Sequence, residues 1–251
     1  MAVHLWLALA LSTLAGVSLG LLGGGGSILA VPILVYVARL DAHQAIGVAL
    51  AIVGTTALVG GLAHARSGQA DARAAVAFGV ASALAAPVGA LATPLFPGRV
   101  LLLLFGALMV GVGGLMLRGR RGKADAARGE RRGLALLGSG LATGLVTGFL
   151  GVGGGFLIVP ALTLLGGLRV HVAVGTSLLV IAATSAAGLA GHLHRGDLPL
   201  GLTAAFAAAA VCGVLLGQRM AGRFDPGRLR RSFAFFVILV GLFLVAANAR
   251  G

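Results

Sequence analysis

Charged residues and cysteines are scarce in this sequence. Only 10% of its 251 residues are charged and 59% are hydrophobic, whereas soluble domains carry roughly 25% charged residues. The mean hydropathy is +1.06. The single cysteine, Cys212, excludes an internal disulfide. So few charges cannot cover a water-facing surface, so the composition predicts a multi-pass membrane protein embedded in the lipid bilayer.

Acidic residues are the scarcest charged type, with six against 19 Lys and Arg. No Asp, Glu, Lys or Arg lies in the middle of an apolar segment, which excludes a carboxylate proton relay. There is also no Ser-His-Asp set, no pair of carboxylates and no Cys/His cluster, so we predict no enzyme activity, no metal site and no cofactor. The net charge of +13 fits basic cytoplasmic loops better than a nucleic-acid surface.

The chain contains an internal duplication. The stretch Gly151–Pro160 repeats Gly23–Pro32 at an offset of 128 positions. Between residues 20–69 and residues 148–197, 18 of 50 positions are identical without a gap. An ungapped match of that length predicts two structural repeats, and the glycine stretch opens the matched core of each.

A polar linker separates the two repeats. Residues 118–132 contain seven Lys and Arg among fifteen residues. We therefore predict a first transmembrane repeat at 1–117, a basic linker at 118–132 and a second transmembrane repeat at 133–251. No Lys or Arg precedes the first apolar run, so we expect no cleaved signal peptide.

Each half contains five apolar segments. They are Leu5–Leu22, Ser27–Ala38, Ala45–Ala63, Ala74–Leu95 and Val100–Leu117, then Leu134–Leu150, Phe156–Leu168, Val172–Leu193, Leu198–Leu216 and Phe233–Ala247. The second segment of each half is shorter than the roughly 20 residues that a full span needs, and glycines precede it. The predicted fold is an all-α polytopic membrane protein with two inverted repeats. Each repeat is a broken or re-entrant glycine hairpin plus three transmembrane helices, about eight helices in all.

The distribution of basic residues favours the inverted arrangement. With the linker in the cytoplasm and each glycine hairpin returning to its own side, 15 Lys and Arg lie inside and 4 outside. Parallel halves would give 11 inside and 8 outside. Cytoplasmic loops carry the excess of Lys and Arg. We therefore predict a plasma (inner) membrane protein with a cytoplasmic linker and both termini external.

Inverted repeats with broken elements at corresponding places are typical of secondary transporters. Backbone N–H groups at a helix start favour an anion, and glycine lets the backbone approach a ligand. The predicted substrate-binding residues of the two breaks are Gly23, Gly24, Gly25, Gly26, Ser27 and Pro32, with Gly151, Gly153, Gly154, Gly155 and Pro160. The alternative is that these glycines serve close packing between helices.

The third apolar segments supply hydroxyl groups. Thr55, Thr56, Thr176, Ser177 and Thr184 are predicted to line the substrate path. Val48 and Ala49 occupy the positions that match Thr176 and Ser177, so the two half-sites are not chemically equal. The alternative for each hydroxyl is a hydrogen bond to the backbone of its own helix.

Histidine is the available group for proton coupling, because no carboxylate lies within the apolar segments. His43 and His171 stand at matching entries to the third segments, and His64 and His192 stand at matching exits. The alternative is an interfacial role at helix ends. His192 and His194 alone provide too few ligands for a metal site.

The second half, Gly148-Phe-Leu-Gly-Val-Gly-Gly-Gly-Phe-Leu-Ile-Val-Pro-Ala-Leu followed by His171-Val-Ala-Val-Gly-Thr-Ser-Leu178, resembles the TauE/SafE family of sulfite exporters. The first half resembles it with the weaker Gly47-Val48-Ala49-Leu50. The resemblance covers essentially the whole chain. It implies a bacterial-type inner-membrane permease of about eight helices that moves sulfite, sulfonates or related organic anions.

We therefore expect a secondary transporter that exports a small anion by alternating access, with a proton as a candidate coupling ion. Two alternatives remain open at this point. One is a passive anion channel, which lacks coupling to a gradient. The other is a non-transporting membrane scaffold, in which packing fills the glycine breaks.

Overall fold

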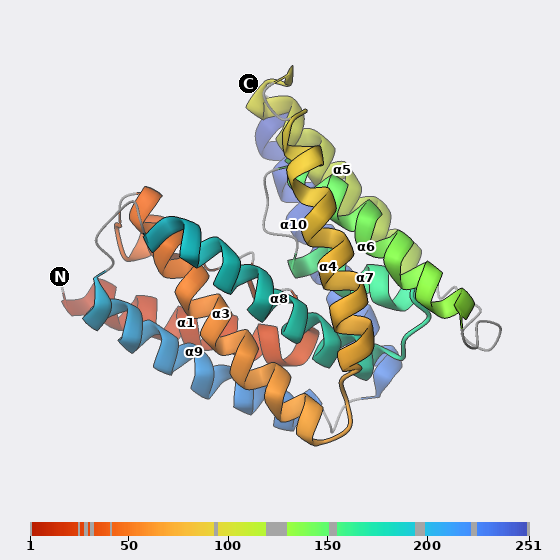
Figure 1. Cartoon of the computed structure of the whole chain (residues 1–251). Coiled ribbons are helices and arrows are strands. Elements are labelled where there is room, and N and C mark those ends of the chain that lie inside the picture. The colour runs from red at the N-terminus through yellow and green to blue at the C-terminus, as the bar shows by residue number, and fades with distance from the viewer. Residues whose placement is uncertain are drawn as a thin grey trace. The chain divides into compact units, whose positions relative to one another are not determined.

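The computed structural model describes residues 2–24, 26–27, 30, 33–40, 42–92, 95–118, 130–150, 155–193, 199–221 and 225–249. These residues form nine α-helices and one π-helical segment, with no strand among them (Figure 1). The elements are α1 (Ala2–Leu22), η1 (Ile33–Val37), α3 (Ala42–Arg66), α4 (Ala72–Ala90), α5 (Gly98–Leu117), α6 (Glu130–Leu150), α7 (Gly155–Leu164), α8 (Val170–Leu193), α9 (Leu200–Ala221) and α10 (Pro226–Ala249). The all-helical prediction is confirmed for this part of the chain.

Within the described residues, five helices are long and apolar enough to cross a membrane. Their candidate spans are Gly47–Arg66, Ala72–Gly89, Arg99–Leu117, Val170–Leu189 and Leu200–Ala221. Shorter apolar stretches lie in α1, α6 and α10. Many large apolar side chains on these helices are exposed, as expected for surfaces that face lipid rather than water.

The helices of the two halves correspond in register. Helices α6, α8, α9 and α10 each begin 128 positions after α1, α3, α4 and α5 respectively. The short second elements also end with equivalent backbone hydrogen bonds. These are Ala38 N–H to Ile33 O (3.0 Å) and Leu40 N–H to Leu34 O (3.0 Å), then Gly166 N–H to Ala161 O (3.0 Å) and Leu168 N–H to Leu162 O (2.9 Å). The duplication therefore extends to local backbone structure.

The chain forms two compact units, and each contains helices from both halves. Unit 1 consists of Met1–Ala75 and His171–Phe224, and unit 2 of Val76–Val170 and Asp225–Gly251. Helices α1, η1 and α3 of the first half thus pack with α8 and α9 of the second half. The remaining helices, with all but the first turn of α4, make up unit 2.

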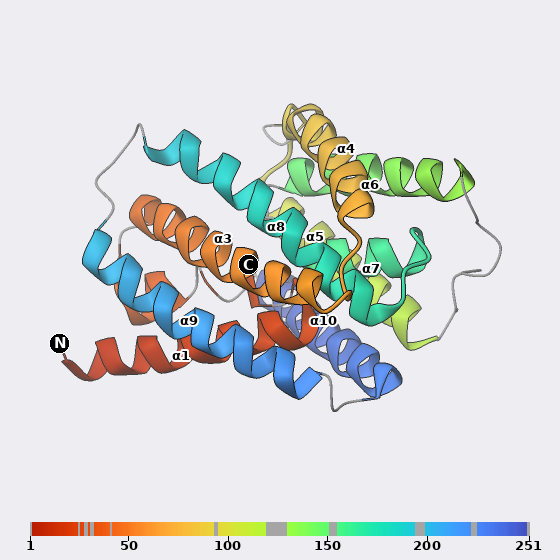
Figure 2. The same cartoon turned by 60° about the horizontal axis from the view of Figure 1, so that its bottom comes forward.

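In unit 1, α1 and α9 pack side by side through glycines (Figures 1 and 2). A Cβ on Gly16 would overlap the carbonyl oxygen of Ala210, and one on Gly20 would overlap that of Val214. The reverse contacts come from α9, where Gly213 and Gly217 pack against α1. Partner numbers rise together along both helices, so α1 and α9 run parallel. Such GxxxG spacing allows backbones in a membrane to approach closely.

The same interface recurs in unit 2 between α6 and α4. Gly144 packs on the Ser82 carbonyl and Gly148 on that of Ala86. Each of these contacts is the α1–α9 contact shifted by the repeat offset. The contact between Gly217 and Val17 likewise recurs between Gly89 and Leu145. One packing mode is therefore used twice, each time between a helix of one half and a helix of the other.

Equivalent helices also pair with each other, and they do so antiparallel. In unit 1, a Cβ on Gly60 of α3 would lie 3.2 Å from Leu178 Cδ1, and one on Gly188 of α8 would lie 3.3 Å from Leu50 Cδ1. These two contacts are repeat equivalents of one another. In unit 2, α5 and α10 also pair through two contacts that are related by the 128-residue offset. Gly113 packs against Ala234, and Gly241 packs against Gly106.

The first half folds back at its glycine break. Helices α1 and α3 both run parallel to α9. Gly16 and then Gly20 of α1 meet Ala210 and then Val214 of α9. On α3, Thr56 shares a cavity with Ala210 and Gly60 meets Val214, and Figure 2 shows the same directions. The residues between Leu22 and Ala42 must therefore carry the chain back before α3 begins. Gly23 starts this return in a left-handed conformation, with φ of 77°, which glycine adopts without steric cost.

We predict that Gly144→Ala destabilises the protein by about 1–3 kcal/mol, because the added methyl overlaps the Ser82 backbone. Gly138→Ala on the same helix is the matched control, since a Cβ there meets no atom within 4 Å. The control should unfold at or above the wild-type temperature, because alanine favours a helix. Thermal unfolding in detergent measures both. Equal unfolding temperatures for the two variants would contradict the close α4–α6 contact.

Candidate functional site

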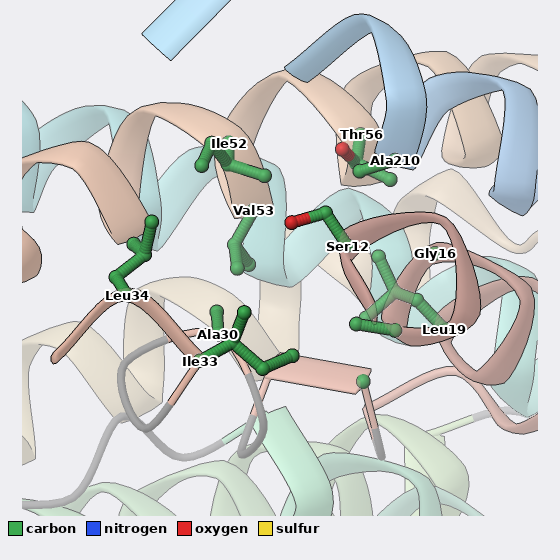
Figure 3. Close-up of a pocket in the computed structure, with 12 residues that line it drawn as sticks. Ser12, Gly16, Leu19, Ala30, Ile33, Leu34, Ile52, Val53, Thr56 and Ala210 are labelled. Atoms are coloured by element: carbon green, nitrogen blue, oxygen red, sulfur yellow. The ribbon is translucent and has the colours of Figure 1, made fainter. Parts of the chain in front are cut away.

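A cavity lies beside the first glycine break in unit 1 (Figure 3). Residues of α1, the returning segment, α3 and α9 line it. They are Ser12, Ala15, Gly16, Leu19, Gly26, Ala30, Ile33, Leu34, Ile52, Val53, Thr56 and Ala210. The volume of about 20 Å³ is enough for one water molecule. In this conformation, the cavity admits a single water-sized group.

The cavity wall is apolar except for two hydroxyl groups. Ser12 on α1 is 6% exposed and Thr56 on α3 is 1% exposed. The Ser12 oxygen points toward Val53 of α3 (Figure 3). Thr56 Oγ1 is buried and has no hydrogen-bond partner among the described residues. A buried hydroxyl without a partner costs free energy, so it marks a place where a water or a ligand oxygen would be stabilised.

The predicted break residues of the first half are partly described. Gly26 lines the cavity, and a Cβ there would overlap the Ala15 carbonyl oxygen. Gly23 and Gly24 are buried. The hydroxyl of Ser27 donates to the Gly24 carbonyl at 2.7 Å. The predicted residues Gly25, Pro32, Gly151, Gly153 and Gly154 lie outside the described residues.

The second break ends at Gly155, which begins α7 and is buried. Pro160 is buried within that helix. Because proline has no N–H, it removes one backbone hydrogen bond from the helix. Helix α7 packs against α6 in unit 2, as the returning segment packs against α1 in unit 1.

Three of the five predicted hydroxyls donate to their own helices. Thr55 Oγ1 donates to Ala51 O at 2.7 Å, Ser177 Oγ to Val174 O at 2.7 Å, and Thr184 Oγ1 to Val180 O at 3.1 Å. This is the alternative arrangement that helix hydroxyls commonly adopt in membranes. It leaves their acceptor lone pairs free, but the single proton is engaged.

Thr176 makes a contact between two segments of unit 1. Its Oγ1 accepts a hydrogen bond from the backbone N–H of Asp71 at 3.0 Å. The Asp71 carboxylate in turn accepts from Ala74 N–H at 2.9 Å, at the start of α4, as an N-cap residue does. Thr176 therefore joins α8 to the loop between α3 and α4.

The predicted histidines lie at the ends of the antiparallel α3–α8 pair. His64 is 4% exposed, and its Nε2 has no hydrogen-bond partner in the described part of the chain. It hydrogen-bonds with Gln69 and lies within electrostatic reach of His171 on α8. His43 and His192 belong to the opposite ends of the same two helices. The structure thus brings His64 and His171 together.

Two polar residues of unit 1 were missed by the sequence interpretation. Gln218 Nε2 on α9 donates to the Gly60 carbonyl on α3 at 2.7 Å. Ser12 lines the cavity opposite Thr56. Their signals were weak, because Gln218 stands next to Arg219 at a helix end and Ser12 matches Gly140 in the second repeat. A lone polar residue within an apolar run was the available clue for Ser12.

We predict different stability effects for two Thr→Val variants. Thr56→Val should leave the free energy of unfolding within about 0.5 kcal/mol of wild type, because Thr56 Oγ1 loses no partner. Thr176→Val should lower it by about 1–3 kcal/mol, because the half-buried Asp71 N–H loses this acceptor. Denaturant or thermal unfolding in detergent distinguishes them. A larger loss for Thr56→Val than for Thr176→Val would refute this reading of the two hydroxyls.

Comparisons with known proteins agree with this architecture. The family model described as "Sulfite exporter TauE/SafE" matches residues 8–244. A "Probable membrane transporter protein" of Xylella fastidiosa strain 9a5c is 37% identical over 238 residues, covering 92% of this chain and 91% of its own length. The Bacillus subtilis "Probable membrane transporter protein YunE" is 27% identical over 259 residues, covering 94% and 95%.

No solved structure matches this chain significantly. The family model nevertheless spans nearly all of both repeats, and the Xylella relative aligns along almost its whole length. The chain is therefore a multi-pass membrane transporter rather than an enzyme, and it belongs to the TauE/SafE family.

Proposed function

We propose that this protein is a secondary transporter that exports a small anion such as sulfite, a sulfonate or a related organic anion. The observation that carries the proposal is the buried, unpartnered Thr56 hydroxyl in a cavity beside a duplicated glycine break. The family description, sulfite exporter, supports the substrate class. Neither feature is needed by a scaffold, in which packing would fill the break.

Uncharged donors bind the anion in this proposal. The described residues that line the cavity include no Lys or Arg, so in this proposal hydroxyls and backbone N–H groups supply the favourable contacts. Such contacts let a transporter bind its substrate and still release it. The proposed binding residues remain the two breaks (Gly23–Ser27 with Pro32, and Gly151–Gly155 with Pro160). The hydroxyls of Thr55, Thr56, Thr176, Ser177 and Thr184 line the path.

We further propose that the two repeats are inverted in the inner membrane, with the 118–132 linker in the cytoplasm. Two observations support the inversion. The equivalent helices α3 and α8 run antiparallel, as do α5 and α10. The inverted arrangement also gathers 15 of the 19 basic residues on one side, which agrees with the positive-inside rule.

The proposed coupling ion is a proton, carried by the histidines of the α3–α8 pair. His64 has a buried, unpartnered Nε2, and the polar groups that reach it are Gln69 from the following loop and His171 from α8. His43 and His192 would serve the same role at the other end of the pair. Histidine can change its charge near neutral pH.

Proteoliposomes loaded with radiolabelled sulfite test the proposal. We expect protein-dependent efflux that an imposed pH gradient accelerates. Thr56→Val should reduce the flux by roughly tenfold to a hundredfold, the effect of losing a hydrogen bond to a charged group, which is worth about 1.5–3 kcal/mol. Thr13→Val is the matched control, because the Thr13 hydroxyl donates to Leu9 O of its own helix at 3.0 Å.

Each other outcome of this assay has a defined meaning. Efflux that ignores the pH gradient would indicate a passive channel or uniporter. No flux of sulfite or of a panel of sulfonates and carboxylates would contradict the proposal of anion export. His64→Asn should keep efflux down a sulfite gradient but lose the response to pH. An unchanged pH response in that variant would exclude His64 from coupling.

The inverted topology makes a separate prediction. In a Cys212→Ala background, a membrane-impermeant maleimide should label Arg195→Cys in intact cells. It should label Ser67→Cys only after permeabilisation, because that position lies in a predicted cytoplasmic loop. Parallel repeats would place both positions inside, so protection of Arg195→Cys in intact cells would rule out the inversion.

A further inference from the structure

Unit 2 contains positions equivalent to the cavity of unit 1. The α1–α9 interface and the α6–α4 interface share three contacts at the repeat offset, between Gly16 and Ala210, Gly20 and Val214, and Gly217 and Val17 in unit 1. Because the backbones pack in the same register, each residue that α1 and α9 contribute to the cavity wall has a defined counterpart on α6 or α4.

The counterparts differ in chemistry. Ala15 and Leu19 of the cavity correspond to Thr143 and Thr147 on α6, and Ala210 corresponds to Ser82 on α4. Three apolar wall positions of unit 1 are thus hydroxyl positions in unit 2. Among the wall positions on α1 and α9, only Ser12 shows the opposite change, because this hydroxyl residue of unit 1 corresponds to Gly140 in unit 2. The duplicated framework therefore carries one apolar and one hydroxyl-rich version of the same wall.

The three hydroxyl residues lie close together in unit 2. Thr143 and Thr147 are one helical turn apart on α6, and the Ser82 backbone packs against Gly144 between them. Thr143 is only 7% exposed and makes no hydrogen bond within the described part of the chain. Thr147 Oγ1 donates to Gly144 O at 3.3 Å, a long hydrogen bond that a ligand oxygen would replace. The hydroxyl of Ser139, one turn earlier, donates a hydrogen bond to Leu136 O at 3.0 Å.

We propose that Ser82, Thr143 and Thr147 form the half-site that binds the oxygen atoms of the transported anion. This inference rests on the proposed export function and refines it. Three neutral donors suit a group with three oxygens, such as sulfite or a sulfonate. A hydroxyl without a protein partner, such as that of Thr143, gives up no internal hydrogen bond when it binds a ligand oxygen. Unit 2 thus supplies the hydroxyl-rich half-site for the anion, and the unit 1 cavity, which contains Ser12 and Thr56, is its more apolar counterpart.

Equilibrium binding of sulfite to the purified full-length protein in detergent tests this assignment. Thr143→Val and Ser82→Ala should each raise the Kd about tenfold or more. Thr143→Ser, which retains the hydroxyl, should bind within about threefold of wild type. Ser139→Ala is the matched control on the same helix and should leave the Kd unchanged, because that hydroxyl is engaged by its own backbone.

The outcomes separate this inference from the proposal on which it rests. If wild type binds sulfite and both Thr143→Val and Ser82→Ala bind within twofold of it, the half-site is wrong and anion export stands. If Ser139→Ala weakens binding as much as Thr143→Val, the effect is structural and the half-site is also wrong. If folded wild type binds neither sulfite nor methanesulfonate, both the half-site and the proposed anion export are wrong. Size-exclusion chromatography and thermal unfolding establish that each variant is folded.

Discussion

Close contact between helix backbones at glycine is the constraint on which this structure depends. Within a bilayer, apolar side chains gain little by leaving lipid, so helices associate through tight packing instead. At Gly16, Gly144 and Gly148, even one added methyl would overlap a carbonyl oxygen of the neighbouring helix. Fixed backbone registers follow from these contacts, and they set the positions of the cavity-lining side chains on α1 and α9.

The sequence predicted where the helices lie along the chain better than it predicted which helices pack against each other. Apolar runs and the 128-residue offset identified the repeated elements, because hydrophobic length and repeated Gly and Pro positions are local signals. The pairing of α1 with α9 was not predictable, since GxxxG spacing is common in a glycine-rich chain and does not name its partner. Gly213 and Gly217 gained meaning only when the structure set them against Thr13 and Val17.

The candidate site likewise contains some residues that the sequence predicted and others that it did not. Gly26 and Thr56 were predicted and line one cavity, whereas Thr55, Ser177 and Thr184 donate to their own helices. Sequence cannot separate these cases, because adjacent helix positions such as Thr55 and Thr56 differ by the roughly 100° turn between residues. Ser12 and Gln218 were missed because neither is repeated in the other half.

The exchange of helices between the two halves has a consequence for synthesis. The glycine face of α1 is covered by α9, which begins at Leu200, so unit 1 cannot close until most of the chain has emerged from the ribosome. Unit 2 waits in the same way for α10 to reach α5. Contacts of such long sequence separation form late. The glycine face of α1 must therefore remain without its α9 partner in the bilayer until then, and neither half of the chain can mature without the other.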